Sequence, residues 1–238
     1  MKADLLTPKP VPVTGGIDTP VIAELRGVSK TYKVGNDQEL KVLDNIDLSI
    51  QEGELLALLG QSGSGKSTLL RCLTGLTQPT AGQVFCYGKP LRGINPYASI
   101  VFQTFALYPW LTVEQNVAVG LMAKAMSRKQ REEAVEKAID LIGLNNYHAA
   151  YPREISGGMR QRVGIARALV SEPKILCLDE AFSALDVLTA ENLRKEVINI
   201  WRKEDTSLQS IFMVTHNIEE AVEMATRICI LFPHPGRL

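Results

Sequence analysis

The clearest chemical signal in the sequence is the stretch GQSGSGKST at residues 60–68. It fits the pattern G-x-x-x-x-G-K-[ST], follows a short apolar run and precedes a helical pattern, which is the context in which such a loop holds phosphates. We expect Lys66 to reach the β- and γ-phosphates of a nucleotide and the Ser67 hydroxyl to bind Mg²⁺. The residues expected to hold the nucleotide here are Gly60, Gln61, Ser62, Gly63, Ser64, Gly65, Lys66, Ser67 and Thr68.

Two adjacent acids, Asp179 and Glu180, form the second signal, because they end the apolar run KILCL. In open α/β sheets, ligands bind outside the carboxyl ends of the strands. Asp179 is therefore a candidate Mg²⁺ ligand, acting through water. Glu180 is placed to accept a proton from an attacking water as a general base. The alternative is that both acids cap the segment that follows.

A second glycine-led helix start lies at residues 154–163, which read EISGGMRQRV. The N–H groups near Ser156, Gly157 and Gly158, together with the helix dipole, can recognise an anion. No lysine or acid follows that could perform chemistry there. Glycine turns before helices are common, so the triplet taken alone is better explained as an ordinary helix cap.

The elements that must position these residues alternate between strand and helix patterns. Strands are expected at residues 23–32, 43–50, 54–60, 82–88, 98–103, 174–180, 210–216 and 227–232. Helices are expected at residues 66–76, 112–126, 127–144, 159–170, 189–204 and 217–225. In the third helix Ser127 and Gln130 fit a capping box, and one apolar face is formed by Ala134, Val135, Ala138, Ile139 and Ile142. The alternation predicts a parallel sheet with helices on both faces and a helical insertion before residue 170.

Composition narrows the class of protein. The chain has 238 residues with 26 basic and 26 acidic side chains, and this balance argues against a nucleic-acid partner, which requires clustered Lys and Arg. No apolar run approaches the roughly 20 residues of a membrane span. The four cysteines are scattered without a C-x-x-C pair, which indicates reduced thiols of a cytosolic protein. Residues 1–20 are rich in Pro, Gly and Thr and are expected to form a loose arm.

Several short motifs occur in a fixed order, namely the phosphate loop, Gln103, ISGGMRQR, ILCLDE, SALD and His216. In this combination, the sequence from about residue 21 to residue 232 resembles the ATP-binding subunits of ABC transporters. The resemblance implies an ATPase domain at residues 21–238 with ATP and Mg²⁺ as cofactors. It also implies an α/β P-loop NTPase fold with a mainly parallel sheet, an antiparallel β subdomain and a helical subdomain at about residues 104–170.

The same resemblance implies roles for four further residues. Tyr32 corresponds to the aromatic residue that stacks on adenine, although it also fits a plain strand tyrosine. Gln103 corresponds to the glutamine that contacts Mg²⁺ and the attacking water. Asp186 corresponds to an acid that contacts the opposite subunit, and it also fits a helix N-cap. His216 corresponds to the switch histidine that contacts the γ-phosphate.

In this family the Ser-Gly-Gly helix faces the γ-phosphate held by a partner subunit, so the resemblance implies a head-to-tail dimer with two ATP molecules between the chains. The triplet is intact here. Ile155 and Met159 stand where Leu and Gln are common, and the amide contact of that Gln is lost. Ala181 stands where Pro is usual, so we expect a less fixed turn with little effect on chemistry.

The absence of a membrane span in the sequence implies separate transmembrane permease subunits, as in bacterial importers. We expect Phe105, Leu107, Tyr108 and Trp110 to line the groove for the permease, the alternative being that they belong to the core. The motifs resemble ATPases of nitrate, sulfonate, taurine or bicarbonate importers, which act at the cytoplasmic face of the membrane and depend indirectly on an extracytoplasmic solute-binding protein. The alternative is a soluble ABC ATPase of the translation or DNA-repair type.

Overall fold

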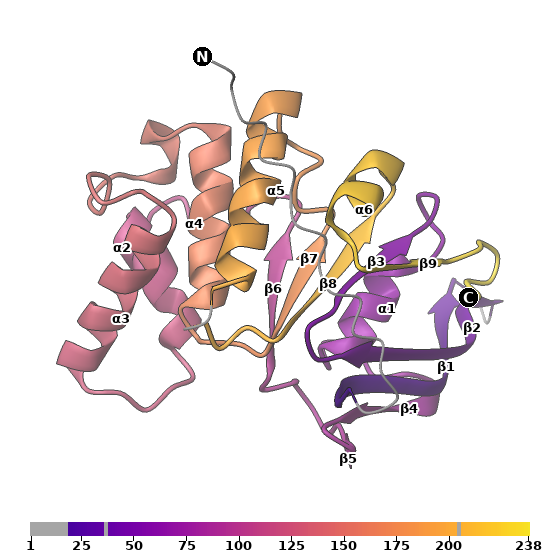
Figure 1. Ribbon diagram of the computed structural model, residues 1–238. Coiled ribbons are helices and arrows are strands. Elements are labelled where there is room, and N and C mark those ends of the chain that lie inside the picture. Colours follow the sequence, from indigo (N-terminus) through magenta and orange to yellow (C-terminus); the bar gives the residue numbers. More distant parts are fainter. Residues whose placement is uncertain (1–18, 36–37, 204–205) are drawn as a thin grey trace.

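The computed structural model describes residues 19–35, 38–203 and 206–238, and its centre is a five-stranded parallel sheet (Figure 1). The expected loose arm lies mostly outside these residues, because residues 1–18 are not described. The central strands are formed by mainly apolar runs such as ILCLD, which is buried along its whole length because helices cover both faces of the sheet. In sheet order the strands are β6 (Ala98–Phe102), β7 (Ile175–Asp179), β8 (Ser210–Thr215), β3 (Leu55–Leu59) and β9 (Arg227–Ile230).

A second, antiparallel sheet packs beside the first, as the family resemblance implied. Gly82 in this sheet has a φ of +76°, and a Cβ there would lie 2.2 Å from the carbonyl oxygen of Gly27, so the close approach of the two strands requires glycine. The strands in sheet order are β2 (Gln38–Gln51), β1 (Val21–Val34), β4 (Ala81–Cys86) and β5 (Lys89–Pro90). The two-residue β5 is the one strand of this sheet that the sequence patterns did not predict.

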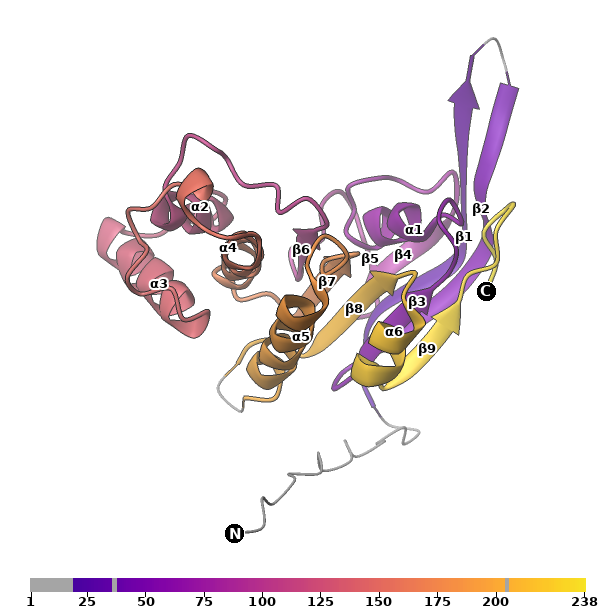
Figure 2. The same cartoon turned by 90° about the horizontal axis from the view of Figure 1, so that it is seen from above.

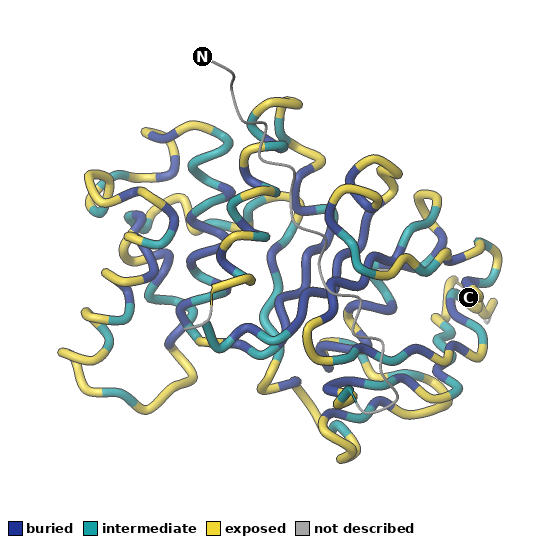
Figure 3. The backbone as a smooth tube through the Cα atoms, viewed as in Figure 1, coloured by how far each residue is buried: buried dark blue, intermediate teal, exposed yellow. Residues whose placement is uncertain are grey.

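Helix α1 (Lys66–Leu73) lies between the two sheets, with Leu69, Leu70 and Leu73 fully buried. On the other face of the parallel sheet lie α5 (Val187–Trp201) and α6 (Ile218–Met224), as the view from above shows (Figure 2). Buried residues lie in the parallel strands, in the antiparallel sheet and on the helix faces that meet them (Figure 3). This arrangement fixes the carboxyl ends of the strands as one rigid edge.

The remaining helices form a group to one side of the parallel sheet, with a core of their own that includes Val117, Leu121, Ile139 and Val163 (Figure 1). The capping box of Ser127 and Gln130 is present. The elements of this group are α2 (Val113–Ala118), η1 (Val119–Leu121), α3 (Arg128–Leu141), η2 (Pro152–Glu154) and α4 (Gly157–Leu169).

The expectation of one helix over residues 112–126 is wrong. The α-helical part ends at Ala118 and a 3-10 turn follows. Gly120 explains the break, because glycine is a poor helix former and a Cβ there would lie 2.2 Å from the carbonyl oxygen of Arg167. The segment therefore ends by packing its backbone against α4.

The cysteines are free thiols, and Cys72, Cys86 and Cys177 are buried. Burial raises the pKa of Cys72 and of Cys86 to about 11, so both stay protonated at neutral pH. None of the helices in the described part of the chain has the length and apolar character needed to cross a membrane.

Candidate active site

The phosphate loop connects β3 to α1. Gly63 and Gly65 have φ angles of +80° and +100°, a region that favours glycine, and Gly65 caps the start of α1. Gly60 has no room for a side chain, since a Cβ would lie 2.7 Å from the carbonyl oxygen of Leu231. Gln61, Ser62 and Gly63 are exposed, whereas Ser64 is buried and Thr68 is half-buried at the start of α1.

Lys66 lies folded over this loop, with its side chain only 4% exposed. Its Nζ donates hydrogen bonds to the carbonyl oxygens of Gly60, at 2.8 Å, and Gln61, at 3.0 Å. The same nitrogen lies 3.6 Å from Oε1 of Glu180. The ammonium group of Lys66 therefore contacts both the phosphate loop and Glu180, the acid that follows β7.

Two of the three side chains predicted to hold Mg²⁺, those of Ser67 and Asp179, lie together. Ser67, in the first turn of α1, donates from Oγ to Oδ1 of Asp179 at 2.8 Å. Asp179 is the last residue of β7 and is only 8% exposed. The pair offers the hard oxygen donors that Mg²⁺ prefers.

Glu180 follows in a turn with a φ of +48°, an uncommon value for a residue other than glycine. Its backbone N–H donates to the carbonyl oxygen of Val214 at 3.0 Å. On the other side, Nδ1 of His216 lies 3.2 Å from Oε2 of Glu180. The carboxylate thus sits between Lys66 and His216, with one oxygen toward each.

The strand register places Gln103 near the same edge, because Phe102 of β6 pairs with Asp179 of β7 and Gln103 comes next in the chain. Gln103 is exposed. Tyr32 lies apart from this cluster, on β1 of the antiparallel sheet, and its ring is 5.0 Å from the Nζ of Lys30. With 37% of its surface exposed, Tyr32 is available for stacking.

The Ser-Gly-Gly triplet begins α4, on the far side of β7 from α1 (Figure 1). Ser156 is the N-cap, and its Oγ accepts a hydrogen bond from the N–H of Met159 at 3.2 Å. This is the helix cap that the pattern alone predicted. The first turn of α4 and the phosphate loop therefore lie in different parts of the molecule.

Asp186 is likewise an N-cap, since its Oδ1 accepts a hydrogen bond from the N–H of Thr189 at the start of α5. Hydrogen bonds from Thr189 lower the pKa of Asp186. The methyl group of Thr189 also lies against Gly158, where a Cβ would approach it to 2.5 Å. The starts of α4 and α5 consequently pack as one unit.

Two residues of this region were missed by the sequence analysis. Arg167 donates to the carbonyl oxygens of Phe105 and Ala106, both at positive φ, and so fixes the segment after Gln103. Burial lowers the pKa of Arg167. The second residue is Glu220, which accepts a hydrogen bond from Thr215, the residue before His216, and burial raises the pKa of Glu220. The two bonds of Arg167 span 61 and 62 residues, so no local pattern signals them. The bond between Thr215 and Glu220 spans five residues, from the end of β8 to α6.

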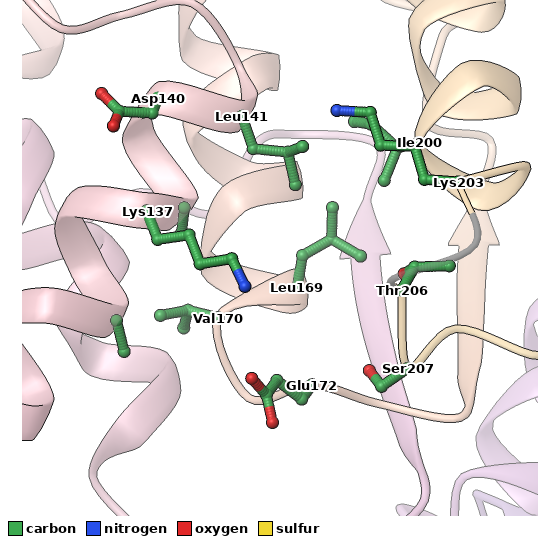
Figure 4. Close-up of a pocket in the computed structure, with 12 residues that line it drawn as sticks. Lys137, Asp140, Leu141, Leu169, Val170, Glu172, Ile200, Lys203, Thr206 and Ser207 are labelled. Atoms are coloured by element: carbon green, nitrogen blue, oxygen red, sulfur yellow. The ribbon is translucent and has the colours of Figure 1, made fainter.

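A cavity of about 370 Å³ lies away from this cluster, near the carboxyl ends of α4 and α5 (Figure 4). Lys137 and Leu141 of α3, Leu169 of α4 and Ile200 of α5 are among the residues around it. None of the predicted site residues borders this cavity. The candidate active site is therefore the group of residues at the carboxyl ends of the parallel strands, and this cavity is not part of it.

A phosphate loop whose lysine meets a carboxylate at the end of a parallel strand defines a nucleoside-triphosphatase of the P-loop class. Comparison with known proteins is more specific, because the sequence profile of the family described as "ABC transporter" matches residues 43–183. The chain belongs to this family, and it is an ABC ATPase that binds ATP. The family and fold predicted from the sequence are therefore confirmed.

Two relatives and one solved structure illustrate the similarity. The nitrate import ATP-binding protein NrtD of Synechocystis sp. is 44% identical over 90% of this chain and 79% of its own length. The aliphatic sulfonates import ATP-binding protein SsuB of Bacillus subtilis is 45% identical over 83% of this chain and 75% of its own length. A structure described as a dimeric, post-hydrolysis state of the ATP-binding cassette MJ0796 bound to ADP and Pi matches with a TM-score of 0.77 and 32% identity, covering 91% of this chain and 96% of that one.

The contact between α4 and α5 yields a prediction on two glycines of one helix. Gly158→Ala should lower the free energy of unfolding by about 1–3 kcal/mol, because its Cβ would displace Thr189. Gly164→Ala is the matched control, since a Cβ there would meet only the carbonyl oxygen of Phe105 at 3.5 Å, an ordinary contact. It should raise stability by about 0.5–1 kcal/mol. Urea titration measures both, and equal effects would contradict the packing described for the first turn of α4.

Proposed function

We propose that this chain is the ATP-hydrolysing subunit of a membrane importer and that two ATPase subunits form its working unit. The ATPase domain would comprise residues 21–238, with a helical subdomain at about residues 104–170. The observation that carries the proposal is the contact of Glu180 with both Lys66 and His216, at 3.6 and 3.2 Å. It gives a general base between a phosphate-binding cation and a second proton-bearing group.

In the proposed reaction each side chain has one task. Lys66 exchanges the carbonyl oxygens of the loop for phosphate oxygens when ATP enters. Glu180 takes a proton from the attacking water, while His216 holds the carboxylate and contacts the γ-phosphate. Gln103, at the same strand edge, orients the water, and Tyr32 stacks on the adenine ring.

The donor set fits Mg²⁺, which the hydroxyl of Ser67, the carboxylate of Asp179 acting through water, and Gln103 at the same strand edge would hold. When bound, the ion neutralises negative charge on the phosphate oxygens. The residues that surround the phosphates are the loop members Gly60, Gln61, Ser62, Gly63, Ser64, Gly65 and Thr68.

A second copy would complete each site. The N-terminus of α4 is suited to binding an anion, since its first N–H groups have no partner within the helix. It lies away from the loop of its own chain, so Ser156, Gly157 and Gly158 would meet the γ-phosphate held by a partner, with Asp186 beside them. The dimeric state of the MJ0796 cassette bound to ADP and Pi supports this arrangement.

The transported solute would be a small anion such as nitrate or a sulfonate, because the relatives NrtD and SsuB are named for these substrates. The permease would bind near the segment after Gln103. Trp110 is 69% exposed and Tyr108 is also exposed, whereas Phe105 and Leu107 are half-buried, with Leu107 packed against the helical core. The first two side chains are thus the better candidates for contact with another subunit.

Glu180→Gln tests the general base. The amide cannot accept the proton, so we expect ATP hydrolysis to fall by about 10²–10⁴-fold while ATP binding is retained and an ATP-bound dimer accumulates. Phosphate release and binding of a fluorescent ATP analogue measure the two effects. Near-normal turnover would rule out this role of Glu180.

Ser156→Arg tests the contribution of the partner. A long cation at the start of α4 should block the approach of the second subunit while one chain still binds nucleotide. Light scattering of the Glu180→Gln background with ATP should then show dimers, and the same background with Ser156→Arg should show monomers. An unchanged ATPase rate of the Ser156→Arg single variant would contradict the shared site.

Co-purification from native membranes tests the transport role. We expect the chain to sit at the cytoplasmic face of the membrane, and the tagged chain to retain a permease after extraction in detergent. Trp110→Ala should weaken that retention while the ATPase rate of the isolated chain stays the same. Recovery with ribosomes or DNA instead would favour the soluble type of ABC ATPase and contradict the importer assignment.

A further inference from the structure

One buried carboxamide in α4 lacks an explanation in packing alone. Gln161 is 0% exposed, and its Nε2 donates to the carbonyl oxygen of Ala181 at 2.5 Å. Its Oε1 is buried with no hydrogen-bond partner in the described part of the chain. An unpaired buried oxygen costs free energy that an apolar side chain would not incur. The contact with Ala181 must therefore offset this cost.

The Ala181 carbonyl belongs to the turn that carries Glu180. The strained φ of Glu180, +48°, persists because neighbouring groups fix the turn. The N–H of Glu180 bonds to Val214, and the N–H and hydroxyl of Ser183 both donate to the Glu180 carbonyl oxygen, at 3.2 and 2.8 Å. Among the described residues, Gln161 supplies the side-chain bond to the next carbonyl. The backbone is thus held on both sides of the Glu180 carboxylate.

The helix that supplies Gln161 also begins with the Ser156 cap, less than two turns earlier. Within one chain, the same rigid helix therefore contacts the turn of Glu180 and presents its N-terminus outward. Gly158 presses against Thr189 at the start of α5, which prevents α4 from shifting independently of that region.

We propose that Gln161 is a positioning residue for hydrolysis, which fixes the turn of Glu180 relative to α4. The proposal rests on the proposed function in that Glu180 is the general base. It adds a physical link between the two sites of a dimer. In each chain, α4 would contact the nucleotide held by the partner, and the same helix would position Glu180 beside the nucleotide held by its own chain. Loss of the bond frees the Ala181 peptide to rotate and moves the carboxylate away from the attacking water.

The test compares Gln161→Met and Gln161→Leu, two apolar replacements of similar size, with the native chain. Both should lower kcat by about 10–100-fold, because a shift of about 1 Å at a reacting group has effects of this size. The KM for ATP and the affinity for a fluorescent ATP analogue should stay within about twofold, because the phosphate loop is untouched. This split distinguishes positioning from general loss of structure.

Asn95→Leu is the matched control, because Asn95 is also a buried carboxamide that donates to a backbone carbonyl oxygen, that of Leu73. It should lower the melting temperature and leave kcat unchanged. Native kcat in either folded Gln161 variant would overturn the proposal, as would an equal fall of kcat in Asn95→Leu. If both Gln161 variants fail to fold while Asn95→Leu folds, the amide is needed for the fold and the positioning role is also overturned.

Glu180→Gln, assayed in parallel, separates this proposal from the proposed function. If Glu180→Gln keeps native turnover, the assignment of the base fails. If Glu180→Gln loses turnover while the Gln161 variants keep theirs, the base stands and only the positioning role fails.

Discussion

The register of the parallel sheet is the constraint on which the rest of the structure depends. Phe102, Asp179 and Val214 lie level across β6, β7 and β8, and Thr215 lies level with Leu59 of β3. The residues that follow these strand ends are Gln103, Glu180, His216 and Gly60, so four distant segments reach one edge together. A shift of one strand by a single residue would turn its side chains to the opposite face and separate Glu180 from Lys66 and His216.

At that edge, charge and backbone geometry depend on each other. Lys66 is almost fully buried, which a cation tolerates only when it is paired or well hydrogen-bonded. It finds two carbonyl oxygens in the loop and a carboxylate from the turn after β7. The turn of Glu180 must adopt an unfavourable φ to present that carboxylate, and the surrounding bonds maintain it. The strain lies at the residue proposed as the general base, and such strain is common at functional sites.

Much of this could be predicted from the sequence because the signals are local. The phosphate loop, the two acids at the end of β7 and the capping box of Ser127 each follow from residues that are close in the chain. The contacts that were missed are long-range, such as Gln161 with Ala181 and Arg167 with Phe105. Tertiary packing also decided where α2 ends, since the helical pattern continues past Gly120 and the approach of its backbone to Arg167 does not appear in that pattern. Local patterns predict which residues perform chemistry, but the side chains that hold them in place depend on the assembled fold.

Helix α4 carries both a motif that the sequence reveals and side chains that hold the site in place. In the single chain, Ser156 caps this N-terminus by accepting from the N–H of Met159. In the proposed dimer, the preceding N–H groups and the helix dipole would bind an anion. The second turn of α4 carries Gln161, and its last turns carry Arg167, which bonds the segment after Gln103. A rotation of this helix would therefore act on both the turn of the base and the segment proposed to contact the permease. Because a helix moves as a rigid body, binding at its N-terminus and motion at the permease surface would be linked through one element.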